Sequence, residues 1–113
     1  MAYLPQIHST QLAARLAAGA LLVDVREAIE LQQASFPLPH VHLPLSILAR
    51  DLFDALPPEL QDKDREIIVA CHHGQRSAQV TAWLRQNGWI NVHNLVGGID
   101  AYAAEVDSSV PYY

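Results

Sequence analysis

The sequence predicts a three-layer α/β/α sandwich around a central, mostly parallel sheet. Short apolar runs rich in β-branched residues alternate with amphipathic stretches along the chain, as in successive βαβ units. The runs at residues 21–25 and 67–70 are almost continuously apolar, which is typical of strands buried on both faces. Right-handed crossovers then place helices on both sides of the sheet.

Size and composition indicate one globular domain over residues 1–113, with its core at about 4–105. Half of the residues are hydrophobic and 17% are charged. A net charge of -5, with only seven Lys and Arg, argues against a nucleic-acid or membrane surface. A single cysteine excludes an internal disulfide, and residues 1–5 lack the basic start of a leader. We therefore expect a cytoplasmic protein.

The first predicted helix follows residues 9 and 10. Ser9 or Thr10 can cap it, Leu12 and Leu16 lie one turn apart on its apolar side, and Gly19 is placed to end it. This helix is expected only to cover one face of the sheet.

The next strand, at residues 21–25, is interrupted by Asp24 and followed by Arg26 and Glu27. The functional crevice of a parallel sheet lies beyond the carboxyl ends of its strands, so these side chains could contact a ligand. The favoured interpretation is that Asp24 and Arg26 satisfy each other or nearby backbone. A short helix is predicted at residues 27–33.

Three prolines prevent residues 36–44 from forming a helix, so an extended connection with a short strand at 41–43 is expected. His40 and His42 would lie on one face of that strand, and with Cys71, His72 and His73 elsewhere in the chain they raise the question of a zinc site. Structural zinc sites usually take closely spaced ligand pairs from two elements, so we predict ordinary histidines and no metal here.

A third helix is predicted from Ser46 to the Pro57 stop, followed by a charged, solvated turn at residues 62–66. The expected apolar stripe of this helix consists of Leu48, Leu52 and Leu56. An ion pair between Arg50 and Asp54 is expected on its outer side.

The last part of the chain repeats the strand and helix alternation. The predicted elements are the central strand at 67–70, a helix at 77–87 capped by Gly88, a strand at 92–95, and a helix at 99–105 opened by Gly97 and Gly98. No role is predicted for the tail that ends at Tyr113.

The only cysteine, Cys71, falls where the central strand enters a loop that leads into a helix. Loop amides and the helix dipole favour negative charge at such a point, and they can lower a thiol pKa from about 8.5 to between about 3.5 and 7.5. An inert buried cysteine is the alternative, but polar neighbours suit an anion cradle better. We predict Cys71 as the catalytic nucleophile, without metal or cofactor. The predicted binding residues are His72, His73, Gly74, Gln75, Arg76 and Ser77.

Four segments in order give the chain a resemblance to single-domain rhodaneses, the thiosulfate sulfurtransferases. They are residues 22–27 (LVDVRE), 42–46 (HLPLS), 69–77 (VACHHGQRS) and 94–99 (NLVGGI), within a likeness that runs from about Leu4 to Tyr102. The resemblance implies the five-stranded sheet of that family. It also implies an enzyme that moves a sulfane sulfur from thiosulfate or a persulfide donor to a thiol or cyanide acceptor through a Cys71 persulfide.

Other functions stay open beside this one. A protein donor or acceptor would make the domain a sulfur-relay module, and a rhodanese-like module used only for binding is a third hypothesis, against which the retained Cys71 argues. Phosphatase or arsenate reductase chemistry is a distant alternative, because such loops hold five residues between Cys and Arg whereas four separate Cys71 from Arg76. Arg76 could contact substrate or hold the loop, and the structural role is favoured.

Overall fold

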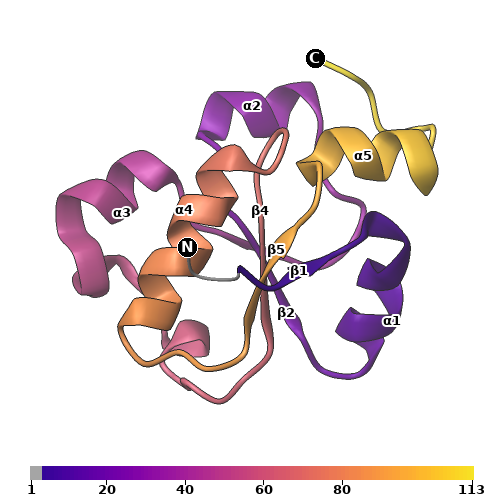
Figure 1. The fold of residues 1–113 in the computed structure, drawn as a ribbon. Coiled ribbons are helices and arrows are strands. Elements are labelled where there is room, and N and C mark those ends of the chain that lie inside the picture. The colour runs from indigo at the N-terminus through magenta and orange to yellow at the C-terminus, as the bar shows by residue number, and fades with distance from the viewer. Residues whose placement is uncertain (1–3) are drawn as a thin grey trace.

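The computed structural model describes residues 4–113 and shows five parallel strands between two helical layers (Figure 1). Met1 to Tyr3 lie outside the described residues. The expectation that the chain starts without a leader rests partly on these residues. The sheet order is β1-β5-β4-β2-β3, which confirms the predicted α/β/α sandwich. The strands are β1 Gln6–Ile7, β2 Leu21–Asp24, β3 Val41–His42, β4 Ile67–Ala70 and β5 Val92–Leu95.

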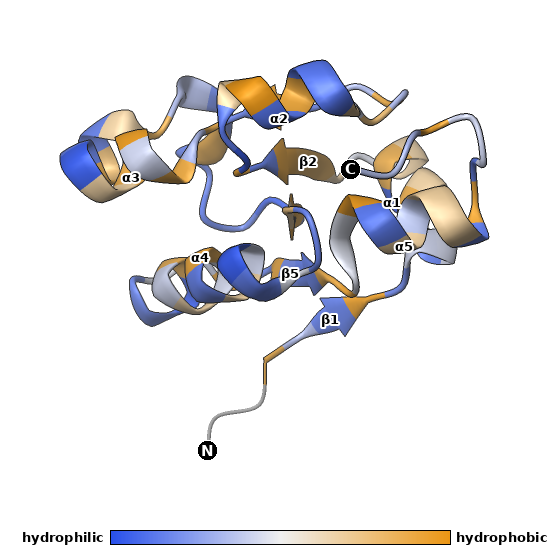
Figure 2. Cartoon of the chain, turned by 90° about the horizontal axis from the view of Figure 1, so that it is seen from above, coloured by the Kyte–Doolittle hydropathy of each residue, from blue (hydrophilic) through white to orange (hydrophobic). Residues whose placement is uncertain are grey.

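The helices cover both faces of the sheet (Figure 2), α3 and α4 on one side and α1 and α5 on the other. No helix within residues 4–113 is long and apolar enough to cross a membrane. The α-helices are α1 Leu12–Ala17, α2 Ala28–Gln33, α3 Leu45–Asp51, α4 Gln75–Gln86 and α5 Gly98–Glu105, and the 3-10 turns are Ser9–Gln11, Leu52–Ala55 and Pro58–Leu60.

The central strand β4 supplies both halves of the core, because side chains of a strand alternate between its faces. Ile68 and Ala70 belong to the apolar cluster on the α1 and α5 side. Ile67, Val69 and Cys71 belong to the cluster on the α3 and α4 side. The alternation therefore sends the Cys71 side chain toward α4, directly beyond the carboxyl end of the strand.

The predicted cap of the first helix is wrong. The chain enters α1 through a 3-10 turn whose N-cap is His8, and the His8 amide donates to Gln11 Oε1 at 3.0 Å. Ser9 is buried, and its hydroxyl donates to Glu105 Oε2 at 3.0 Å. The Ser9 hydroxyl thus joins the beginning of the chain to the end of α5, a contact that a local sequence pattern does not reveal.

The third helix is shorter than predicted. Its N-cap is Pro44 rather than Ser46, and it ends at Leu52, where φ is +52° and a 3-10 turn follows. This left-handed residue breaks the predicted stripe, so Leu52 is 53% exposed. The predicted ion pair is also wrong, since Arg50 binds Asp51 at 2.8 Å instead of Asp54.

Two histidines that raised the question of zinc bind backbone instead. His40 Nδ1 lies 2.8 Å from the Leu38 carbonyl oxygen, and His42 Nε2 lies 2.7 Å from that of Arg26. Both rings therefore fix the extended connection around β3.

The Asp24 and Arg26 side chains form a fully buried ion pair at the end of β2, as the favoured interpretation predicted. Arg26 Nη2 and Nε donate to the Asp24 carboxylate at 2.7 to 3.1 Å, and the Arg26 amide donates to Asp24 Oδ1 at 3.0 Å. Neither side chain is exposed to solvent. The pair holds the turn that leads from the sheet into α2.

Replacing Asp24 should destabilise the protein strongly, because Arg26 would keep its charge in a buried place without a partner. We expect Asp24→Ala to lower the free energy of unfolding by about 3–5 kcal/mol, measured by urea denaturation. The matched control is Asp51→Ala, which removes the partner of the exposed Arg50 and should leave the denaturation midpoint near that of the wild type. Equal effects of the two substitutions would contradict the role of the buried pair.

Candidate active site

The loop that joins β4 to α4 lies next to α2 and the start of α5 (Figure 1), and Cys71 is its first residue. The residue is 1% exposed. Its sulfur is nevertheless surrounded by polar hydrogens: the Gly74 amide donates to Sγ at 3.1 Å, and the Ser77 hydroxyl lies 3.3 Å from Sγ. The loop thus folds back over the sulfur and directs donors at it.

Two opposing effects set the pKa of the Cys71 thiol. Burial disfavours the thiolate, whereas the Ser77 hydroxyl and the amides of Ser77, Gly74 and His73 stabilise it. The donors outweigh the burial, so the pKa lies below the ordinary value of a cysteine. The position at the start of the twelve-residue helix α4 acts in the same direction.

The Ser77 hydroxyl has one proton and two acceptors within reach, Cys71 Sγ at 3.3 Å and Asn94 Oδ1 at 2.6 Å. Asn94 Nδ2 donates to the Gly74 carbonyl at 3.1 Å, which assigns Oδ1 to the side that faces Ser77. The shorter bond favours Asn94 while the thiol is neutral. A thiolate is the stronger acceptor, so ionisation of Cys71 would draw the Ser77 proton toward sulfur.

Two glycines allow the loop and the start of α5 to pack closely against each other. Gly74 has a φ of +99°, and a Cβ there would lie 3.2 Å from the Gly97 nitrogen. At Gly98 a Cβ would lie 2.4 Å from the Cys71 carbonyl oxygen and 2.5 Å from that of His72. The start of α5 therefore packs directly on the backbone of the loop.

Arg76 binds Glu30 in α2. Its Nη1 and Nη2 donate to the two carboxylate oxygens at 2.7 and 2.8 Å. The Arg76 guanidinium is the main reason that the pKa of Glu30 falls to about 2, against the smaller, opposite effect of burial. The same pair raises the pKa of Arg76. Glu30 thus takes one hydrogen bond from each Nη atom of Arg76.

The tail has a structural role, so the sequence-based interpretation of it was wrong. Arg26 Nη1 donates to the Tyr113 hydroxyl at 2.9 Å, and that hydroxyl donates to Glu30 Oε1 at 3.0 Å. The Tyr113 ring stacks on His72 with centroids 3.9 Å apart. Val110 is also buried in the apolar core. Tyr113 therefore links the buried pair at β2 to the ion pair that holds the loop.

The predicted binding residues differ in their relation to the sulfur. His73, Gly74 and Ser77 supply the amides around it, whereas Arg76 faces Glu30. His72 is half-buried between the rings of His73 and Tyr113. The side chains of His73 and Gln75 are exposed.

Sequence reasoning missed three residues that support the site: Glu30, Asn94 and Tyr113. The sequence offered a signal for Asn94, because a polar residue within a predicted buried strand needs buried partners. In the structure Asn94 lies in β5 and is 3% exposed. Glu30 and Tyr113 carried no local signal, since their partners lie 46 and 83 or more residues away.

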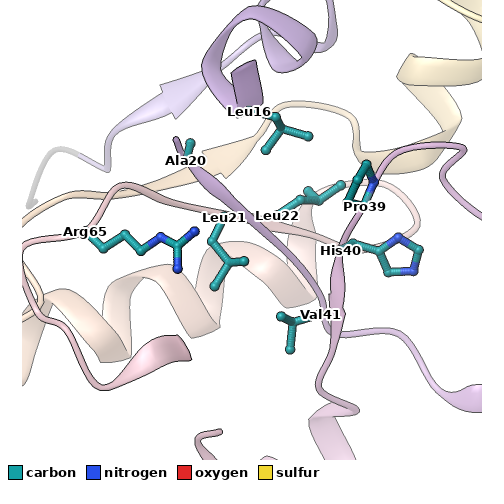
Figure 3. Close-up of a pocket in the computed structure, with 8 residues that line it drawn as sticks. All are labelled: Leu16, Ala20, Leu21, Leu22, Pro39, His40, Val41 and Arg65. Atoms are coloured by element: carbon teal, nitrogen blue, oxygen red, sulfur yellow. The ribbon is translucent and has the colours of Figure 1, made fainter. Parts of the chain in front are cut away.

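Two hollows in the surface lie elsewhere. One of about 270 Å³ is formed by Leu16, Leu21, Leu22 and Val41 at the amino ends of β2 and β3, with Arg65 and His40 on opposite sides of it (Figure 3). The other, of about 390 Å³, includes Phe53, Lys63 and Trp89. Neither is lined by a residue of the 71–77 loop.

Comparison with known proteins gives a consistent family. Residues 8–105 match the rhodanese-like domain. A sulfurtransferase of Allochromatium vinosum is 37% identical over 100 residues, which cover 87% of both proteins. An adenylyltransferase and sulfurtransferase of Zea mays is 35% identical over 82% of this chain. The crystal structure of a rhodanese-related protein from Thermoplasma volcanium is 30% identical, has a TM-score of 0.73, and is matched over 90% of this chain and 93% of that one.

Several relatives are much longer than the matched segment. The chain spans 19% of the Zea mays protein and no more than 30% of two other curated relatives.

Loss of the Ser77 hydroxyl should raise the pKa of Cys71. A hydrogen bond to a charged group contributes about 1.5–3 kcal/mol, and competition from Asn94 reduces this, so we expect Ser77→Ala to shift the pKa upward by about one unit. The rate of alkylation by iodoacetamide, followed across pH, measures the shift. The control is Thr81→Ala one turn later in α4, whose hydroxyl binds the Ser77 carbonyl and whose loss should not move the midpoint. An unchanged profile in Ser77→Ala would exclude the hydroxyl as a thiolate donor.

The Glu30 and Arg76 pair should stabilise the protein in a pH-dependent way. A depressed carboxyl pKa contributes stability that is fully present above the unfolded pKa of about 4.3 and is lost as the pH falls through the folded value, here about 2. We expect Glu30→Gln to lower the free energy of unfolding by roughly 1–2 kcal/mol at neutral pH, less than the full shift implies because water screens the pair.

Urea denaturation at neutral pH and below pH 4 checks this expectation, and the difference from the wild type should shrink with acid. The exposed Glu59→Gln is the matched control. Arg76→Ala should cost a similar amount, and the double variant no more. A deficit of Glu30→Gln that is equal at both pH values would show that charge is not the cause.

Proposed function

The chain belongs to the rhodanese-like domain family, and we propose that it is a sulfurtransferase that carries a sulfane sulfur on Cys71 as a persulfide. The observation that carries this proposal is the convergence of the Gly74 amide and the Ser77 hydroxyl on Sγ, which lowers the pKa of the thiol. A thiolate is the form that attacks a sulfur atom. The sulfurtransferase names of relatives support the same class of reaction.

In the first step, the Cys71 thiolate attacks the outer sulfur of the donor. A bond forms between Sγ and that sulfur, and the sulfur's bond to the rest of the donor breaks with its electron pair. With thiosulfate, the leaving group is sulfite. No proton has to be moved, because the nucleophile is already ionised and the leaving group is a stable anion.

In the second step, an acceptor thiolate or cyanide attacks the outer sulfur of the persulfide. The S–S bond breaks, and its electron pair returns to Sγ as the thiolate. The terminal sulfur of the waiting persulfide is anionic and needs donors, which the loop amides from His72 to Ser77 can supply. Because Cys71 is 1% exposed, a donor must displace loop side chains to reach the sulfur, which favours donors whose reacting end is small.

A sulfur-relay role is the second candidate. The Zea mays relative combines an adenylyltransferase with a sulfurtransferase, and this chain spans only 19% of it. A similar domain thus occurs within a longer protein that has another activity. In that role, the donor or acceptor of the Cys71 sulfur would be a protein rather than a small molecule.

The direction of Arg76 argues against phosphatase or arsenate reductase chemistry. A loop that encircles a tetrahedral oxyanion directs its amides and its arginine at the oxygens. Here the Gly74 amide lies 3.1 Å from Sγ itself, and both Arg76 Nη atoms bind Glu30. The cradle fits one sulfur atom better than a phosphate.

Loading of the protein with sulfur tests the proposal. We expect incubation with thiosulfate or glutathione persulfide to add one sulfur atom to the intact mass, cyanide to remove it as thiocyanate, and Cys71→Ser to show neither. His40→Ala, a substitution outside the loop, should load like the wild type.

Each other outcome identifies a different function. Loading only from a persulfide-bearing protein, with negligible loading by small donors, would favour the sulfur-relay module over an enzyme that uses small donors. Absence of added sulfur with every donor, or loading that survives Cys71→Ser, would refute the persulfide.

A further inference from the structure

Beside the sulfur, His72, His73 and Asp100 bring two imidazoles and a carboxylate together. One ligand atom of each lies within 4.8 Å of those of the others. Asp100 lies in the first turn of α5, and Figure 1 shows the start of this helix next to the loop after β4. The cluster therefore joins two elements that meet at the carboxyl end of the sheet.

The backbone holds the two parts of this cluster in register. The Ile99 amide donates to the Cys71 carbonyl at 2.9 Å, and the Asp100 amide donates to the His72 carbonyl at 3.1 Å. The close approach at Gly98 leaves no room for the helix start to shift toward the loop. Asp100 is consequently fixed opposite His72 by the main chain rather than by a flexible surface contact.

We propose that His72, His73 and Asp100 form a binding site for a divalent transition-metal ion, for which Zn²⁺ is the best match. Two imidazole nitrogens and one carboxylate oxygen are the ligand set of zinc sites that keep a fourth position open. Nitrogen ligands of this kind suit Zn²⁺, Ni²⁺ or Cu²⁺ and not Mg²⁺ or Ca²⁺, which prefer oxygen.

A second observation points to a ligand at His72. Its Nε2 atom is buried and has no hydrogen-bond partner within residues 4–113. A buried polar atom without a partner keeps the cost of losing water, so such atoms are rarely left that way. The ring cannot easily turn to find another partner, because it is stacked against the Tyr113 ring. A metal ion would use the lone pair that this fixed ring offers.

The distances require a small closure of the cluster. Tetrahedral zinc with bonds of about 2.0–2.1 Å places its ligand atoms about 3.4 Å apart, so the ligand atoms must close by up to about 1.4 Å. A metal ion lies close to the plane of each imidazole that binds it, so the His73 ring must turn out of its stack on His72. His73 is exposed and can turn, and the half-buried Asp100 side chain can rotate on its fixed backbone.

The charge around the cluster suits a cation. The charged groups that act on His72 are the carboxylates of Asp100 and Glu30 and the guanidinium of Arg76. With neutral imidazoles, this leaves one net negative charge. Arg76 is also held away from the cluster by Glu30.

The main competing site is the Cys71 thiolate, because zinc also binds sulfur. The experiment must therefore separate binding by the cluster from binding by the thiol. The Cys71→Ser variant removes the thiol and keeps all three proposed ligands. The double variant His73→Ala with Asp100→Asn keeps the thiol and removes two of the ligands.

Titration calorimetry with zinc chloride on the metal-free protein at neutral pH tests the proposal. We expect one Zn²⁺ per chain in the wild type and in Cys71→Ser, and affinity lower by about hundredfold or more in the double variant. The matched control, His8→Ala with Asp64→Asn, changes the same residue types at exposed positions outside the cluster and should bind like the wild type.

Two further measurements secure the result. Circular dichroism checks that the variants fold, and Asp100→Asn alone replaces the double variant if that one does not. The visible spectrum of Co²⁺ bound to Cys71→Ser should show tetrahedral coordination that the double variant loses. Loss of binding in Cys71→Ser, undiminished binding in the double variant, or no binding by the wild type would each overturn the proposal.

Discussion

The donation of peptide and hydroxyl hydrogens to a nearly buried sulfur is the interaction on which this site depends. Burial alone would keep the Cys71 thiol neutral, and a neutral thiol at the end of β4 would be only one more member of the apolar core. The Gly74 amide and Ser77 hydroxyl reverse that balance from within the same loop. The alternation of β4 is what brings the sulfur under these donors, because Ile67 and Val69 share its face.

The cradle is supported by contacts from distant parts of the chain. Glu30 holds the loop through Arg76, and Asn94 holds it through Ser77 and the Gly74 carbonyl. The Ile99 and Asp100 amides of α5 donate to two of its carbonyls. Tyr113 then connects Glu30 to the buried Arg26. Each contact comes from a different element at the carboxyl edge of the sheet, so the folded sheet assembles the site.

The parts that sequence could predict are those set by local pattern. The strands at 67–70 and 92–95 are confirmed to the residue, since β-branched runs between turn residues have few alternatives. The sequence also predicted a helix directly after the loop of the only cysteine. The end of α3 at Leu52 could not be predicted, because a leucine with positive φ has no sequence signature. The prediction for the tail was wrong for another reason, because Tyr113 contacts residues that are distant in the sequence and that folding brings to it.

Arg76 shows how one residue type can support different chemistry in loops of similar sequence. In an oxyanion loop, an arginine gains most by facing the ligand with both nitrogens. Here both Nη atoms bind the Glu30 carboxylate instead, and this bidentate ion pair holds the pKa of that carboxyl at about 2. The remaining donors at the sulfur are neutral amides and one hydroxyl. Such a set suits a single anionic sulfur, whereas the charge of Arg76 is used to hold the loop against α2.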